Sequence, residues 1–229
     1  METNYNKEVE KAENLSLFDN RELVGFLVGL VLGDASISSR LEVTMSQSRK
    51  HSIYLNQALK ILSGFLKVKV GMYHRTFADI RYKGKLYYSS TLRIPIDKEL
   101  IFLRNIFYDN GKSKRKMIPL NIADYLTPMG LAHWISCDGQ ACQRGGLFLC
   151  TDSFKKEEVE ILIEALKTKF NLESKLSKKK SYERVYWRIY ISGQAKNWQI
   201  LKELILPYLD NSMLYKIRVN NVKSGALEK

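Results

Sequence analysis

The chain has few of the residues that form disulfide frameworks or zinc sites: three cysteines and three histidines among 229 residues. An odd number of cysteines cannot pair completely, and their positions do not make two Cys-x-x-Cys clusters, so neither kind of site is predicted. The histidines are scattered through the sequence, and we expect each to have a structural or surface role: His51, His74 and His133.

The chain also lacks a long hydrophobic run. Its longest uncharged apolar stretch, residues 23–33, is shorter than the roughly 20 residues that a membrane-spanning helix requires. The opening segment, METNYNKEVEKAENLSLFDN, is polar and contains no apolar region of a signal peptide. We therefore expect a soluble, intracellular protein without a membrane partner.

Basic residues are in clear excess. Lys and Arg number 37 against 24 acidic residues, which gives a formal net charge of +13. This charge makes a polyanion the first candidate partner and an acidic membrane surface the second. Charge alone does not choose between them. With 45% hydrophobic residues, the chain is long enough for one large domain or two small ones with a real core.

The sequence contains an internal repeat. GFLVGLVLGDA at 25–35 recurs in pattern as MGLAHWISCDG at 129–139, and each copy is an apolar, helix-like segment that ends in Asp. A short alternating stretch, a helical pattern, two strand-like segments and a closing helix follow each copy. This order predicts an α+β protein made by tandem duplication. The helical patterns lie at 50–66 and 155–170, and the strand-like segments at 66–76, 80–94, 172–180 and 184–192.

Glycines recur at every fourth position of the first repeat, Gly25, Gly29 and Gly33. Each costs about 1 kcal/mol of helix propensity relative to alanine. A stripe of small residues lets a second helix approach almost to backbone contact, which offsets that cost. If the two repeat helices pack side by side, their closing acids Asp34 and Asp138 come together. Adjacent carboxylates raise each other's pKa unless a divalent ion bridges them, and oxygen ligands favour Mg²⁺ or Mn²⁺.

The strand-like segments alternate between an apolar face and a face rich in basic and aromatic residues. The alternation places Tyr88, Leu92, Ile94, Val185, Trp187, Ile189 and Ile191 in the core. It places Lys67, Lys69, Tyr73, Arg75, Lys85, Tyr87, Ser89, Thr91, Arg93, Arg184, Tyr186, Arg188 and Tyr190 on the opposite face.

Such a face suits duplex DNA, because Lys and Arg neutralise phosphates and a two-stranded ribbon fits the major groove. Strands of about ten residues span ~33 Å, close to one duplex turn, so two halves cover about 20 base pairs. Because the halves differ in sequence, the site should not be a palindrome. The residues predicted to contact DNA are Ser38, Arg40, Lys67, Lys69, Tyr73, Arg75, Arg81, Lys83, Lys85, Tyr87, Arg93, Arg144, Lys175, Lys179, Arg184, Tyr186, Arg188 and Tyr190.

The two repeats resemble the motifs of the LAGLIDADG homing endonucleases in their single-chain, intron-encoded form. The motif copies are LVGLVLGDA at 27–35 and LAHWISCDG at 131–139, and the resemblance covers about residues 20–220. It implies two αββαββα halves related by a pseudo-twofold axis, with paired motif helices at the interface and two antiparallel sheets forming a DNA-binding saddle. It also implies a monomer of mitochondrial or other organellar origin. The expected parts are an arm at 1–19, a first half at 20–115, a linker at 116–127 and a second half at 128–229.

The resemblance also assigns the site. It implies a magnesium- or manganese-dependent enzyme that cuts both strands across the minor groove and leaves 3′ overhangs, with Ca²⁺ permitting binding without cleavage. Asp34 and Asp138 match the metal-binding acids, helped by the carbonyls of Gly33 and Cys137; Lys116 and Lys216 match two basic residues near the cut, and Gln47 and Asp152 match polar positions that organise the attacking water.

The chain departs from the family pattern at four positions. Ala35 replaces the final glycine of the first motif, and His133 and Trp134 replace Gly and Leu in the second. Asp152 stands where Gln or Asn is usual. Both metal-binding acids remain, which favours cleavage. Two other functions stay open: an RNA maturase that assists splicing of a group I intron, and a DNA-binding regulator on the same scaffold that does not cut.

Overall fold

The computed structural model describes residues 21–66, 70–79, 84–95, 101–109, 115–143 and 145–218. The predicted N-terminal arm at 1–19 lies outside these residues. So do five of the predicted DNA contacts: Lys67, Lys69, Arg81, Lys83 and Arg144.

The first half contains a four-stranded antiparallel sheet with the strand order β1-β2-β4-β3. Its first helix carries the first repeat motif, and its second helix follows the second strand after a single 3-10 turn. The elements are α2 (Arg21–Leu32), β1 (Ala35–Ile37), β2 (Glu42–Ser48), η2 (Arg49–His51), α3 (Ser52–Phe65), β3 (Gly71–Asp79), β4 (Lys85–Pro95) and α4 (Ile101–Phe107).

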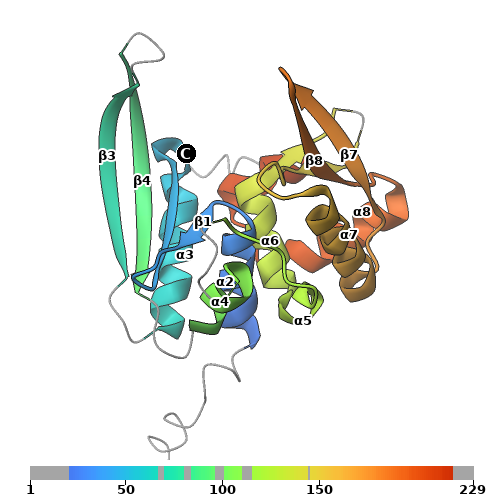
Figure 1. The fold of residues 1–229 in the computed structure, drawn as a ribbon, viewed down its shortest axis with the longest axis horizontal. Coiled ribbons are helices and arrows are strands. Elements are labelled where there is room, and N and C mark those ends of the chain that lie inside the picture. The colour runs from blue at the N-terminus through green and yellow to red at the C-terminus, as the bar shows by residue number, and fades with distance from the viewer. Residues whose placement is uncertain are drawn as a thin grey trace, which may run out of the picture.

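The second half repeats this plan, with the strand order β5-β6-β8-β7. Figure 1 shows the hairpins β3–β4 and β7–β8 on opposite sides of a central helix pair, which confirms the predicted α+β duplication. The elements are α5 (Ile122–Tyr125) in the predicted linker, then α6 (Pro128–Asp138), β5 (Gly139–Ala141), β6 (Leu147–Leu149), α7 (Lys156–Phe170), β7 (Ser174–Ser181), β8 (Arg184–Ile191), α8 (Ala195–Ile205) and η5 (Asn211–Ile217).

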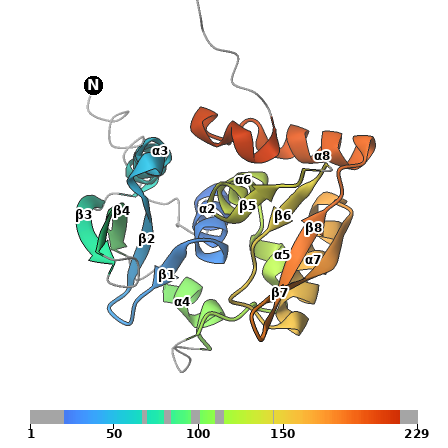
Figure 2. The same cartoon turned by 90° about the horizontal axis from the view of Figure 1, so that it is seen from above.

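The central helices α2 and α6 lie side by side (Figure 2). They pack through the glycine stripe. A Cβ atom added to Gly29 would lie 2.0 Å from the carbonyl oxygen of Gly130, and one added to Gly33 would lie 2.4 Å from Cys137 Cβ. The backbones therefore approach as closely as the repeat predicted, and glycine is required at the crossing point. Gly25 meets Thr127 in the same way, with 2.2 Å between the added Cβ and Thr127 Oγ1.

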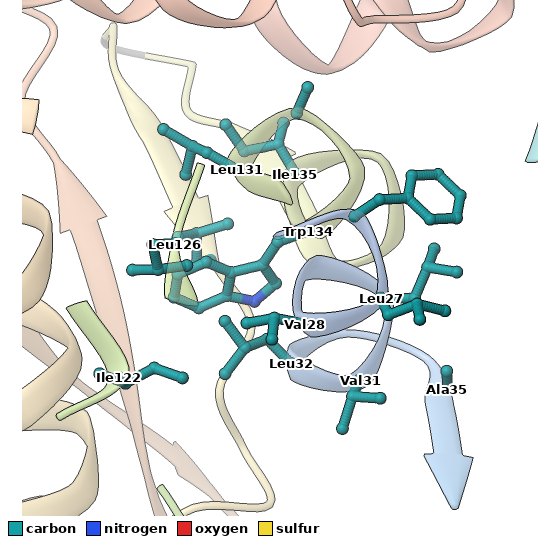
Figure 3. Close-up of a cluster of buried hydrophobic side chains, with 14 of the residues drawn as sticks. Leu27, Val28, Val31, Leu32, Ala35, Ile122, Leu126, Leu131, Trp134 and Ile135 are labelled. Atoms are coloured by element: carbon teal, nitrogen blue, oxygen red, sulfur yellow. The ribbon is translucent and has the colours of Figure 1, made fainter. Parts of the chain in front are cut away.

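The two residues of α6 that depart from the family motif, His133 and Trp134, are both buried in the core. The fully buried Trp134 packs its indole among Leu126, Val28 and Leu32 (Figure 3). His133 is buried too, its ring 4.4 Å from that of Phe26 between centroids, and its Nδ1 lies 3.1 Å from Tyr54 Oη. Burial lowers the pKa of His133 to about 3, so the imidazole is neutral. None of the helices among the described residues is long and apolar enough to cross a membrane.

The strands alternate as predicted near the helices but not toward the hairpin tips. Leu92 and Ile189 are fully buried, whereas Tyr88 is 49% and Val185 43% exposed. Placing Tyr88 and Val185 in the core was wrong, because both hairpins extend past the last residue of the neighbouring strand. Thr91 pairs with Tyr73 on the predicted basic face, but it is buried there, with its hydroxyl 2.7 Å from that of Ser46.

Candidate active site at the ends of the paired helices

Two carboxylates lie at the C-terminal ends of the central helices. Asp34 follows α2 and is exposed, and Asp138 is the last residue of α6 and is partly buried. Burial and the charge of Asp34 raise the pKa of Asp138 to about 7, although Lys116 and Lys216 oppose the shift. The pairing of α2 with α6 therefore brings the two acids into the same electrostatic environment, as the sequence predicted.

This raised pKa leads to a prediction for stability. Between about pH 4 and pH 7 the native chain keeps a proton on Asp138 that the unfolded chain releases, so the free energy of unfolding should fall as pH rises through this window. Each pKa unit corresponds to about 1.4 kcal/mol. In EDTA, Asp138→Asn should unfold at a higher temperature than the native sequence at pH 8, and the gap should shrink at pH 5. A gap independent of pH would contradict the shift.

A polar cavity of about 280 Å³ adjoins Asp34. Gln47, near the end of β2, donates a hydrogen bond from Nε2 to Asp34 Oδ2 at 2.7 Å. A cavity of this size has room for several water molecules, which suits a hydrolytic site. Its lining residues are Asp34, Ser46, Gln47, Ser48, His51, Ser136, Cys137 and Lys216.

Lys116 covers the end of α2. Its Nζ donates to the carbonyl oxygens of Val31, Gly33 and Ala35 at 2.7, 2.9 and 3.0 Å. A cation here interacts favourably with the negative end of the helix dipole, and these three bonds use all three ammonium protons. Burial lowers the pKa of Lys116, while Asp138 and Asp34 act in the opposite direction.

Lys216, in η5, has the corresponding place beside α6 but makes fewer bonds. Its Nζ donates to the carbonyl oxygen of Cys137 at 2.8 Å, and it also lines the cavity beside Asp34. Burial lowers its pKa, and Cys137 and the two aspartates oppose that shift. Lys216 therefore brings positive charge into the space where Asp34 and Gln47 meet.

The second half does not reproduce the Gln47 contact. Ala35 pairs with Met45 and Gly139 with Leu149, so the position equivalent to Gln47, two residues after Met45, is Thr151. Thr151 is fully buried, and its hydroxyl donates to the carbonyl oxygen of Trp187 at 2.7 Å.

Asp152, to which the family resemblance assigned this role, forms an ion pair with Arg188. Arg188 Nε and Nη2 donate to the two carboxylate oxygens of Asp152, each at 2.6 Å. This bidentate pair holds the pKa of Asp152 below its usual value. Arg188 also donates from Nη1 to Gln140 Oε1 at 3.3 Å, so its guanidinium is held in place on the sheet surface.

The donors around the two acids suit a hard divalent ion. Burial raises the pKa of the Cys137 thiol to about 12, so its sulfur is protonated and the residue offers its carbonyl oxygen instead. Carboxylate and carbonyl oxygens are ligands that Mg²⁺ and Mn²⁺ accept. Within the described part of the chain, no three His, Cys, Asp or Glu side chains cluster to hold a metal by themselves. Water and a phosphate would have to complete the ligand shell.

Basic and aromatic side chains line one face of both sheets. In the first, the Arg93 guanidinium lies 5.4 Å from the centre of the Tyr73 ring, and in the second, Lys175 Nζ lies 5.4 Å from that of Tyr190. Strand register puts the other predicted contacts whose side chains are described on these faces: Arg75, Tyr87, Lys179, Arg184, Tyr186 and Arg188. Arg40 is exposed in the turn between β1 and β2, where Ser38 Oγ accepts a hydrogen bond from the Glu42 N–H.

Sequence reasoning missed several residues that the structure brings to the site. Ser46, Ser48 and His51 line the cavity, and Gln140 and Phe148 share the sheet face of Tyr190 and Arg188. For His51 a signal was present in the sequence, because it lies four residues after Gln47. The three scattered histidines were nevertheless expected to have structural or surface roles. For Ser46 and Ser48, alternation with Met45 places them on the outward face of β2.

Comparisons with known proteins show the family of the chain. The LAGLIDADG DNA endonuclease family matches residues 24–198. The chain is 36% identical over 109 residues to the cytochrome b mRNA maturase bI2 of Saccharomyces cerevisiae, a match that covers 47% of this chain and 25% of that longer protein. It is 27% identical over 221 residues to the maturase bI2 of Debaryomyces hansenii, covering 93% of this chain and 76% of the relative.

Two further similarities cover nearly the whole chain. A probable intron-encoded endonuclease 1 of Wickerhamomyces canadensis is 26% identical over 203 residues, or 85% of this chain and 83% of the relative. The solved structure of the homing endonuclease I-WcaI bound to its DNA recognition sequence superimposes with a TM-score of 0.72 at 25% identity, covering 87% of each chain. Together with the duplicated fold and the paired acids, these matches show that the chain belongs to the LAGLIDADG DNA endonuclease family.

Proposed function

We propose that this protein is a site-specific homing endonuclease that binds a long, non-palindromic duplex across both sheets and hydrolyses one phosphodiester in each strand. The observation that carries the proposal is the meeting of Asp34 and Asp138 at the ends of α2 and α6, between two sheets that present basic faces. The similar fold of I-WcaI, solved on its DNA recognition sequence, supports the same use of this surface. Both acids belong to one chain, so a monomer is sufficient.

The proposed metal ligands are the carboxylates of Asp34 and Asp138 and the carbonyls of Gly33 and Cys137. A bound Mg²⁺ or Mn²⁺ would lower the pKa of water and neutralise charge that develops on the phosphate; Ca²⁺ should support binding without cleavage. Lys216 would stabilise the same charge from the cavity wall, and Lys116 would act from its place over the end of α2. The proposed ligands lie at or just beyond the C-terminal ends of α2 and α6, and each lysine donates to a carbonyl oxygen at one of those ends.

The polar residues beside the acids have separate proposed tasks. Gln47 would orient the attacking water, because its amide already contacts Asp34 and lines the cavity. Asp152 would act through Arg188, holding the guanidinium at the DNA face by two hydrogen bonds. This is a positioning role and differs from the water-organising role that the family pattern implies.

DNA binding should weaken steeply with salt. If basic residues on the two sheet faces neutralise about six phosphates, the logarithm of the binding constant falls by about 0.9 for each phosphate per logarithmic unit of salt. Affinity should then drop about a thousandfold or more between 50 and 200 mM salt. Fluorescence anisotropy with a labelled duplex in Ca²⁺ measures this slope. A slope near zero would contradict the proposed contact surface.

The experiment that tests the function is cleavage of a plasmid carrying the candidate insertion site, with Mg²⁺ and with EDTA. The site would be the rejoined exon junction if the gene lies in a group I intron, an organellar setting that the intron-encoded relatives support. Metal-dependent double-strand cleavage supports the nuclease. Tight, specific binding with no cutting would support a regulator instead.

A second candidate function is that of an RNA maturase. The observation in its favour is that the relatives in Saccharomyces cerevisiae and Debaryomyces hansenii are named cytochrome b mRNA maturases. A maturase should bind the host intron RNA and increase its rate of splicing in vitro. Retention of both acids favours cleavage, and a single protein can have both functions, so splicing is measured alongside cutting.

A further inference from the structure

His51 reaches the active centre through the turn that follows β2. It is the last residue of η2 and the N-cap of α3, and it lines the same cavity as Asp34, Gln47 and Lys216. Its imidazole does not cap α3. Within the described part of the chain, this side chain has no hydrogen-bond partner, so its ring nitrogens are available to molecules in the cavity.

The surroundings of His51 favour its neutral form. Burial is the largest influence that lowers its pKa, followed by the charges of Lys216 and Lys50, while Asp34 acts in the opposite direction. A neutral imidazole has one ring nitrogen that accepts a hydrogen bond and one that donates. In a cavity with room for several waters, such a ring can hold a water molecule that also contacts Gln47 or Asp34.

The other half offers no equivalent imidazole. The residue at the N-cap of α7, which corresponds to His51 at the N-cap of α3, is Lys155, and it is exposed. The equivalent of Gln47 is the buried Thr151, bonded to the backbone of β8. The second half contains one histidine, His133, and it is buried between Phe26 and Tyr54. The two centres therefore present different side chains to the two DNA strands.

We propose that His51 belongs to the active centre beside Asp34, where it accepts a hydrogen bond from the attacking water and serves the cleavage of one DNA strand only. This inference rests on the proposed endonuclease function. Gln47 contacts Asp34 directly, and His51 approaches the same cavity from the next turn of the chain, so the two side chains can fix the water from different directions. Misplacement of the reacting water by about 1 Å costs roughly a hundredfold in rate.

Strand-resolved kinetics test the proposal. A duplex with a different fluorophore on each strand is cut under single-turnover conditions in Mg²⁺. His51→Ala should slow cleavage of one strand about 10- to 100-fold and change the other less than about twofold, so nicked DNA accumulates. His51→Gln should recover part of the lost rate, because its carboxamide oxygen also accepts a hydrogen bond. The matched control is Lys155→Ala, at the corresponding N-cap, which should leave the ratio of the two strand rates unchanged.

Equal slowing of both strands, or no slowing of either, would overturn the proposal. Thermal unfolding and DNA affinity in Ca²⁺ are measured for each variant, and a one-strand defect in a variant with native unfolding temperature and affinity supports it. If His51→Ala unfolds more easily, His51→Gln carries the test, with the same one-strand defect expected in weaker form. If the native chain cuts neither strand of its site, the endonuclease function is overturned together with this inference. If the native chain cuts normally and His51→Ala cuts both strands at the native rates, this inference alone is overturned.

Discussion

Asp34→Asn and Asp138→Asn should each reduce double-strand cleavage at least about a thousandfold while leaving DNA binding largely intact. Each change removes a negative charge from the only pair of acids at the junction of α2 and α6 within the described residues, and a neutral amide is a poor ligand for Mg²⁺. The loss should be large because the bound ion both activates water and stabilises charge in the transition state. Binding should survive, because the basic faces of the two sheets make the phosphate contacts.

Plasmid cleavage in Mg²⁺ and duplex affinity in Ca²⁺ together make the measurement. Asp124→Asn is a suitable control, since Asp124 is an exposed acid on α5, and it should cut at the native rate. Unchanged cutting by either active-site variant would refute the assigned role. Loss of binding in step with cutting would instead show that the acids hold the fold or the DNA and have no particular part in the chemistry.

The repeat predicted the packing of the two central helices well, because this packing depends on local, periodic features of the sequence. Gly25, Gly29 and Gly33 at helical spacing required close approach of a partner helix, and the structure places backbone or small side chains opposite each of them. The same reasoning brought Asp34 and Asp138 together without any knowledge of long-range contacts. These predictions succeeded because one element, the helix pair, determined them.

Other features depended on register and on where strands end, which periodicity does not reveal. Thr151, and not Asp152, is the equivalent of Gln47, and this follows only from strand pairing. Tyr88 and Val185 alternate with core residues but lie beyond the covered part of the sheet. The strands β1 and β5 have three residues each, too few to show a pattern of alternation. The position of His51 depends on one 3-10 turn.

The second large effect is expected from Gly29→Ala, at the point where the central helices cross. Alanine improves helix propensity by about 1 kcal/mol, so a helix considered alone should gain stability. The added Cβ would however lie 2.0 Å from the Gly130 carbonyl oxygen, which is backbone and cannot rotate away as a side chain can. The helices must separate, and separation loosens the packing of Trp134 and the spacing of the two acids.

We expect this substitution to lower the free energy of unfolding by about 3 kcal/mol or more, corresponding to a fall of roughly 6–12 °C in melting temperature. Cleavage should fall as well, because the acids at the helix ends move apart. The control is Gly64→Ala in α3, where an added Cβ meets nothing within 4 Å and the chain should become up to about 1 kcal/mol more stable. Calorimetry of the two variants separates the effect of helix propensity from the effect of packing. If the melting temperature of Gly29→Ala equalled or exceeded that of the native chain, the tight crossing of α2 and α6 would be wrong. The reason for placing Asp34 beside Asp138 would then be lost as well.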